Sequence, residues 1–251
     1  MHIWDTFVSH CTLDGSQRDI SFYGGIIMEN KKTKRKATAR RITESAMLLA
    51  IAIVLELLSK IFIPEQPFGG QLTLVSMLPV VLIGYRHGTR WGLVAAFTYA
   101  LLEMAIGMKT VSAAFLPGYF GDGTMILKAL TMCLLDYILA FTALGLGGIF
   151  RNRIKKPNVG LMCGSIVALT GRYVCHVLSG YILFSGWAEW FFTQEGFPAW
   201  GAQLVESLSP VGLSWVYSLV YNGMYMIPEI ILTAVVALIL GRIPKIAAKI
   251  S

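Results

Sequence analysis

Residues 171–184 read GRYVCHVLSGYILF, and residues 214–229 read SWVYSLVYNGMYMIPE. Both stretches are otherwise as apolar as lipid, yet they carry four conspicuous polar side chains: Arg172, His176, Tyr217 and Asn222. Polar side chains at bilayer depth are costly, and they are usually retained for a site or a partner. The two stretches therefore indicate a membrane protein with a polar pocket near one face.

The composition supports this interpretation. Of 251 residues, 55% are hydrophobic and only 14% are charged, whereas soluble domains carry roughly 25% charged residues. A helix needs roughly 20 apolar residues to cross the hydrocarbon. We predict an all-α integral membrane protein with a six-helix membrane domain over 42–241. The six expected spans are 42–63, 72–85, 91–108, 125–150, 160–184 and 213–241.

The distribution of basic residues predicts the orientation. Seven of them fall between Lys31 and Arg41, in a basic leader over 28–41, and others lie in the 151–157 loop and the tail 242–251. The 185–212 loop has none. By the positive-inside rule both termini are cytoplasmic. A basic run can also bind nucleic acid, but beside a span we interpret it as a topology signal.

The first 27 residues are polar and mixed, without the pattern of a signal peptide. We interpret 1–27 as a non-native extension, with synthesis starting at Met28; the alternative is a disordered N-terminal extension.

The sequence offers no set of residues for catalysis or for a metal ion. The four cysteines form no CxxC pair, the histidines form no HExxH motif, and no GxxxxGK[ST] loop is present. We therefore expect no cofactor, no metal and no enzyme activity, with any ATP hydrolysis supplied by partner subunits.

The predicted depths of the polar side chains below the outer membrane surface agree, which favours one shared pocket. Since a helix rises about 1.5 Å per residue, Tyr217 lies about 6 Å below the outer surface, His176 and Asn222 about 12–13 Å, and Asp136 about 16 Å. A buried carboxylate needs a cation or a proton, and tyrosine rings bind cations. This combination suits a small, flat, cationic heteroaromatic ligand. The alternative is a structural bridge between Asp136 and Arg172, with the tyrosines at the membrane interface.

Other features favour plainer interpretations. Glu56 and Glu103 are expected near span ends or paired with neighbours. The 185–212 loop holds many aromatic residues, which prefer the membrane interface or could form a lid over the pocket.

Four segments resemble the thiamine-specific S components (ThiT) of energy-coupling-factor (ECF) transporters. They are 77–88 (MLPVVLIGYRHG), 135–141 (LDYILAF), 172–180 (RYVCHVLSG) and 217–223 (YSLVYNG), within a resemblance covering about 37–240. The resemblance implies a subunit of the bacterial plasma membrane that captures thiamine from outside. It also implies docking with a membrane coupling subunit and two ATP-binding-cassette ATPases.

By the same resemblance, substrate-binding positions fall on Asp136, Tyr137, His176, Tyr217 and Asn222. Ala46 and Ala50 match the contact with the coupling subunit.

The chain departs from the family pattern at three positions. Asp136 stands where a glutamate is expected, Phe184 replaces a stacking tryptophan, and Gly70 falls where another tryptophan is expected, with Phe68 nearby. Other possible functions are an S component for another vitamin or a thiamine precursor, a stand-alone proton-coupled carrier using Asp136 and His176, and a membrane enzyme with His176 as base.

Overall fold

The computed structural model describes residues 35–64, 70–120 and 125–248, and the regular elements in these ranges are helices. The chain divides into two units, 1–46 and 47–251. The described part of the first unit, 35–46, is helical and begins the helix Arg35–Phe62. The expected extension 1–27 and the first half of the basic leader, 28–34, lie outside the described residues.

The remaining helices follow in order. After the first helix come α2 (Leu78–His87), α3 (Thr89–Ile106) and α4 (Met108–Ala114). The next helix is built from α5 (Met125–Met132), the π-helical segment η1 (Cys133–Leu139), α6 (Ala140–Thr142) and the 3-10 segment η2 (Ala143–Gly148). Then come α7 (Pro157–Phe184), η3 (Ser185–Trp187), α8 (Ala188–Thr193), α9 (Trp200–Ser207), α10 (Pro210–Leu240) and α11 (Pro244–Ala247).

Among the described residues, four helical stretches are long and apolar enough to cross a membrane: Arg35–Phe62, Ile126–Gly148, Pro157–Thr193 and Pro210–Leu240. The pair Thr89–Ile106 and Met108–Ala114, bent by 74°, counts as a fifth if it forms one span. The prediction of an all-helical membrane protein is confirmed, but the six-helix count is not.

The prediction of a helix over 72–85 is wrong at its start, because α2 begins only at Leu78, with Pro79 in its first turn. The preceding residues form hydrogen bonds with other segments instead. The Thr73 amide donates to Glu229 Oε2 over 2.6 Å, and the Leu74 amide donates to Ser59 Oγ over 2.7 Å. Non-helical backbone at membrane depth is tolerated where the protein itself supplies such partners.

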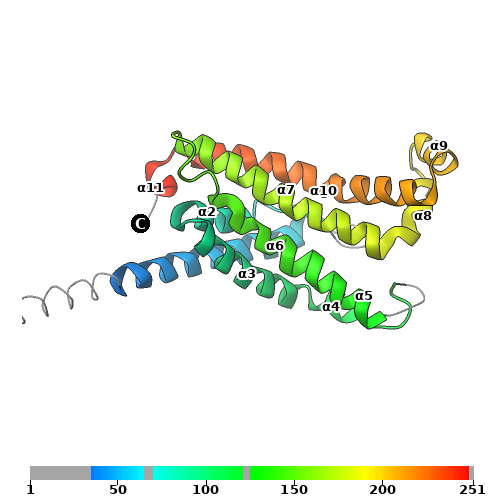
Figure 1. Ribbon diagram of the computed structural model, residues 1–251, viewed down its shortest axis with the longest axis horizontal. Coiled ribbons are helices and arrows are strands. Elements are labelled where there is room, and N and C mark those ends of the chain that lie inside the picture. The colour runs from blue at the N-terminus through cyan, green and yellow to red at the C-terminus, as the bar shows by residue number, and fades with distance from the viewer. Residues whose placement is uncertain (1–34, 65–69, 121–124, 249–251) are drawn as a thin grey trace, which may run out of the picture. The chain divides into compact units, whose positions relative to one another are not determined.

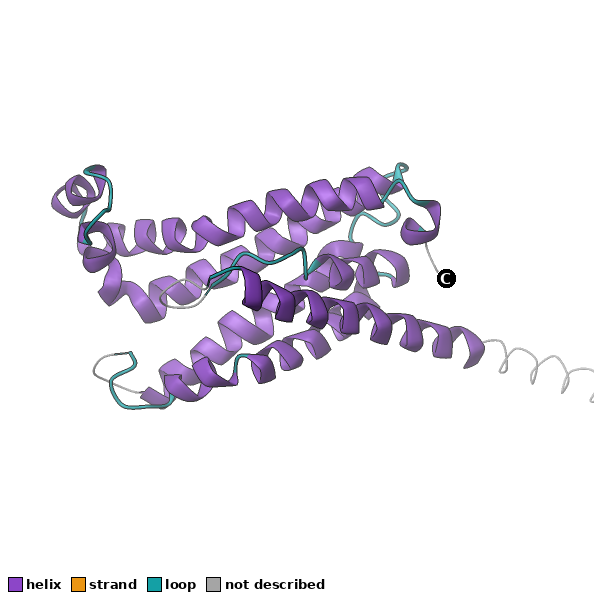
Figure 2. Ribbon diagram, turned by 180° about the vertical axis from the view of Figure 1, so that it is seen from behind, coloured by secondary structure: helices purple, strands orange, loops and turns teal. Residues whose placement is uncertain are grey.

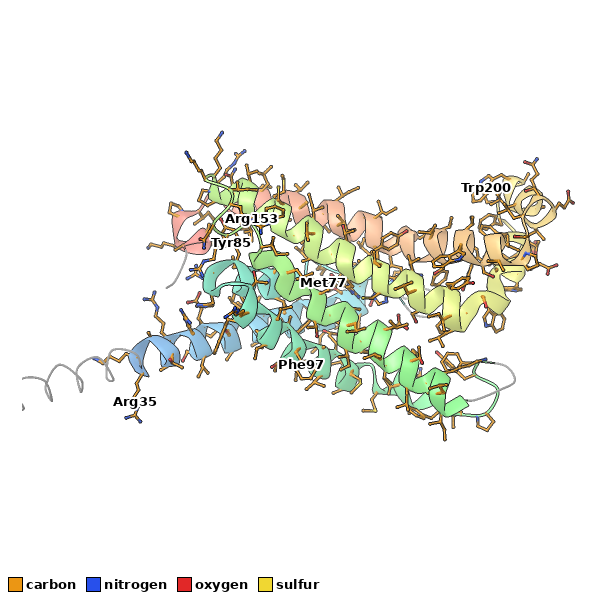
Figure 3. All side chains as sticks on the ribbon, viewed as in Figure 1. Arg35, Met77, Tyr85, Phe97, Arg153 and Trp200 are labelled. Atoms are coloured by element: carbon orange, nitrogen blue, oxygen red, sulfur yellow. The ribbon has the colours of Figure 1, made fainter. Side chains whose placement is uncertain are left out.

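Helices α7 and α10 lie side by side along their length, as Figures 1 and 2 show from opposite sides. Ser218 Oγ donates to the Val177 carbonyl over 2.6 Å, and Tyr173 OH donates to the Leu219 carbonyl over 2.8 Å. Helices α8 and α9 join them at the end opposite α11 (Figure 1). In Figure 3, Trp200 of α9 and Arg153 of the 151–156 turn mark these two ends.

Glycines bring η2 close to its neighbours. A Cβ atom added to Gly145 would collide with the backbone of Gly92 and Leu93 in α3. Small residues allow such close helix approach in membrane proteins. The contact positions the helix that carries η1, and therefore Asp136, against α3.

We predict that Gly145→Ala destabilises the protein by about 1–3 kcal/mol, the usual cost of overpacking. The measurement is the thermal unfolding of the detergent-purified protein. Gly186→Ala is the matched control, because a Cβ atom at Gly186 meets nothing within 4 Å. Equal melting temperatures for the two variants would contradict the close contact.

Candidate functional site

One cavity of about 170 Å³ lies within the unit 47–251. Its walls come from the first helix, the segment before α2, and the helical segments α3, α4, α5, η1, α6, α7 and α10. The structure brings every predicted substrate-binding residue to this cavity: Gly70, Asp136, Tyr137, His176, Phe184, Tyr217 and Asn222. Their roles toward a ligand stay predictions.

Asp136 lies in the π-helical segment η1. Such segments are rare and often occur at functional sites. Its two carboxylate oxygens are both engaged by α7: Oδ1 lies 2.8 Å from His176 Nδ1, and Oδ2 accepts a hydrogen bond of 2.5 Å from Ser179 Oγ. The Asp136 side chain is 21% exposed, so its charge is largely withdrawn from water yet still reaches the cavity.

Arg172 does not form the structural bridge considered from the sequence. Among the described residues, the basic side chain within ion-pairing distance of Asp136 is His176, which carries a charge only when its ring is protonated. The Arg172 guanidinium instead lies over the Phe141 ring, 4.5 Å from its centroid, and Nη1 lies 2.6 Å from Met77 Sδ. The carboxylate of Asp136 is therefore not neutralised by an arginine.

His176 presents one ring nitrogen to Asp136 and leaves the other unpaired. Nδ1 faces a carboxylate oxygen, so the neutral ring carries its proton there, and Nε2 has a free lone pair. Nε2 is buried and has no hydrogen-bond partner among the described residues. Since His176 lines the cavity, this nitrogen is suited to accept a hydrogen bond from a ligand.

Asn222 connects α10 to the same wall. Its Nδ2 donates to the His176 carbonyl over 3.2 Å and to the Ser218 carbonyl over 2.9 Å, while Oδ1 accepts from Tyr225 OH over 2.8 Å. Because both amide atoms are engaged, Asn222 fixes His176 and Tyr225 in place and retains one lone pair on Oδ1 for a ligand.

Aromatic rings form much of the rest of the wall. Tyr217 is 1% exposed and lies 5.3 Å from Phe191 and 5.7 Å from Tyr221, between ring centroids. Phe184 lies 5.6 Å from Phe120. Phe191 belongs to α8, so part of the aromatic 185–212 loop packs against the tyrosines of the cavity.

Gly70 has φ of +89°, and an added Cβ atom would collide with the Tyr225 ring. A larger side chain cannot occupy this position unless Tyr225 moves. Phe68, suggested as a substitute, lies outside the described residues.

A second polar part of the cavity was not predicted from the sequence. Glu56, Lys60, Gln71, Thr73 and Glu103 also line it. Glu56 was expected near a span end or paired with a neighbour; it is buried and accepts a hydrogen bond of 2.8 Å from Ser76 Oγ.

The helical spacing of Ser179 three residues after His176 was the available signal for its contact with Asp136.

These features define an all-helical membrane protein with a pocket whose walls combine carboxylates, one histidine and several aromatic rings. A model of the thiamine transporter protein family matches residues 42–247, and the chain belongs to this family. The resemblance stated from the sequence is thereby confirmed.

Two relatives agree with this assignment. The thiamine transporter ThiT of Bacillus subtilis (strain 168) is 29% identical over 209 residues, covering 80% of this chain and 89% of the relative. A solved structure of ThiT from Listeria monocytogenes has a TM-score of 0.54 at 20% identity, covering 84% of this chain and 98% of that one. The second comparison supports the fold.

We predict that the neutral His176 ring is protonated on Nδ1 and bare on Nε2, because the Asp136 carboxylate faces Nδ1. Nitrogen-15 NMR of the histidine-labelled protein, with assignment by His176→Gln, measures the tautomer. Asp136→Asn should remove the preference, since an amide can also donate to this nitrogen. A wild-type ring protonated on Nε2 would contradict the contact.

Proposed function

We propose that the protein is the substrate-capture subunit of an ECF-type importer in the bacterial plasma membrane. It binds thiamine from the outside and delivers it inward when docked to a membrane coupling subunit and two ABC ATPases. Membership of the thiamine transporter family supports thiamine uptake. The chain has no P-loop motif of its own, which favours an energy source in partner subunits.

The observation that carries the ligand assignment is the Asp136 carboxylate in the aromatic cavity. It has no arginine partner among the described residues, and its hydrogen bonds come from His176 and Ser179. Thiamine is a cation with two flat rings, so a negative charge among aromatic walls complements it. His176 Nε2 offers an acceptor for the amino group of the vitamin.

The proposed docking surface for the coupling subunit is based on a pair of small residues in the first helix. Ala46 and Ala50 are both exposed and lie four residues apart on the helix Arg35–Phe62, so they share one face of it. Small residues at this spacing let another helix approach closely. Their contact with the coupling subunit is part of this proposal.

We predict that Asp136→Asn weakens thiamine binding by at least about 30-fold, because removing one partner of a buried charge pair costs about 2 kcal/mol or more. Quenching of intrinsic tryptophan fluorescence or calorimetry measures the affinity. Glu189→Gln removes the same charge from an exposed residue of α8 and should leave the affinity unchanged. Equal affinity for wild type and Asp136→Asn would refute the role of Asp136.

A panel of thiamine, its pyrimidine precursor and other vitamins, tested by thermal shift, separates thiamine from the alternative ligands. Stabilisation by another vitamin, with none by thiamine, would replace thiamine in this proposal.

We predict that Ala46→Phe and Ala50→Phe retain thiamine binding but lose co-purification with the coupling subunit and uptake by vesicles containing the full complex. Ile51→Phe is the control, since Ile51 is exposed on the same helix but lies about 100° around it from Ala50. Thiamine uptake by vesicles containing this chain alone would instead support a stand-alone carrier.

A further inference from the structure

The cavity holds buried polar atoms that the contacts among the described residues leave unsatisfied. Four of its lining residues each have one such atom: Gln71 Oε1, Glu103 Oε1, Arg172 Nε and His176 Nε2. Two are acceptors by nature, and His176 Nε2 is a third when Nδ1 donates to Asp136. Buried polar groups normally have hydrogen-bond partners, so we expect a ligand of this cavity to supply mainly hydrogen-bond donors.

The orientation of Gln71 follows from its neighbours. Its Nε2 donates to the Ser59 carbonyl over 3.0 Å and also to the Ile63 carbonyl. With the nitrogen directed at the first helix, Oε1 is the atom left without a partner. The Gln71 side chain is buried, so its oxygen has no access to bulk water.

Glu103 of α3, like Gln71, has one buried side-chain oxygen without a hydrogen-bond partner among the described residues. It is 4% exposed, and among the described residues its Oε1 has no hydrogen-bond partner and no ion pair reaches it. The charges of Glu56, Lys60 and Arg172 lie close enough to act on it. Glu56 has a donor in Ser76, and the neighbouring donor of Glu103 is the hydroxyl of Tyr99. Oε1 of Glu103 still has no partner within hydrogen-bond distance among the described residues.

The charge of the cavity favours a cation. Its lining includes three carboxylates, Glu56, Glu103 and Asp136, against two basic groups, Lys60 and Arg172. Behind the wall, Glu229 accepts two hydrogen bonds from Thr73, of 2.6 and 2.7 Å, and adds a fourth buried carboxylate. A buried carboxylate needs a nearby positive charge or a donor to offset its loss of hydration.

We propose that Gln71 and Glu103 form a second subsite of the cavity, distinct from the Asp136–His176 contact, which takes a small cationic hydrogen-bond donor of the ammonium type. The donor is either a free monovalent cation or a donor group of the bound vitamin. In the second case the inference rests on the proposed function.

The first arm of the test needs no vitamin. Thermal unfolding of the detergent-purified protein is compared in ammonium chloride and in tetraethylammonium chloride at equal concentration, the latter having the same charge but no N–H group. The free-cation form predicts that ammonium raises the melting temperature of the wild type and of the Glu189→Gln control. Glu103→Gln and Gln71→Leu should lose this shift.

The second arm measures thiamine affinity in tetraethylammonium chloride. If the vitamin supplies the donor, Glu103→Gln lowers the affinity at least about tenfold, as expected for one hydrogen bond to a charged group, and ammonium has no effect on melting. Should Glu103→Gln fail to fold, Glu103→Asp, which withdraws the carboxylate by one methylene, takes its place.

The proposal is overturned if ammonium and tetraethylammonium give equal melting temperatures and thiamine affinity in both variants stays within twofold of the wild type. Water alone would then satisfy Gln71 and Glu103. If the wild type does not bind thiamine, the proposed function fails and the first arm alone decides the subsite.

Discussion

The hydrogen bonds between Asp136 and α7 are the constraint on which the cavity depends. A carboxylate withdrawn from water is stable only if donors or opposite charges replace its hydration. Here both carboxylate oxygens of Asp136 contact α7: Oδ1 contacts His176 Nδ1, and Oδ2 accepts a hydrogen bond from Ser179 Oγ. Because these residues are three apart and share a face of α7, the two contacts fix how α7 is rotated toward η1.

The same constraint extends to α10. The His176 carbonyl accepts from Asn222, and Asn222 Oδ1 in turn accepts from Tyr225 OH. Asp136, His176, Asn222 and Tyr225 thus form a continuous series of contacts across three helices. A wall held in this way is preorganised, so a ligand loses less of its binding free energy to ordering side chains.

The parts of this arrangement that follow from local pattern could be predicted. The apolar lengths of α7 and α10 were expected within three residues at each end, and helical rise placed Asp136, His176 and Asn222 at similar depths. The non-helical segment before α2 could not be predicted, since its apolar residues resemble a span. Its decisive partner, Glu229, lies 156 residues away from Thr73.

The π-helical segment could not be predicted from the sequence either, because a wider turn does not change the apolar character by which the span was recognised. Glu56 and Glu103 were judged by their position in single helices, whereas their surroundings come from packing between helices.

The shorter acid at position 136 acquires a physical meaning from these contacts. Its oxygens are committed to α7, so the ligand need not touch them for the charge to matter. Coulomb attraction weakens only in inverse proportion to distance and is far stronger in a buried site than in water. In the proposed binding mode Asp136 therefore supplies the counter-charge, while His176 Nε2 and the acceptors of the proposed second subsite make the directional contacts.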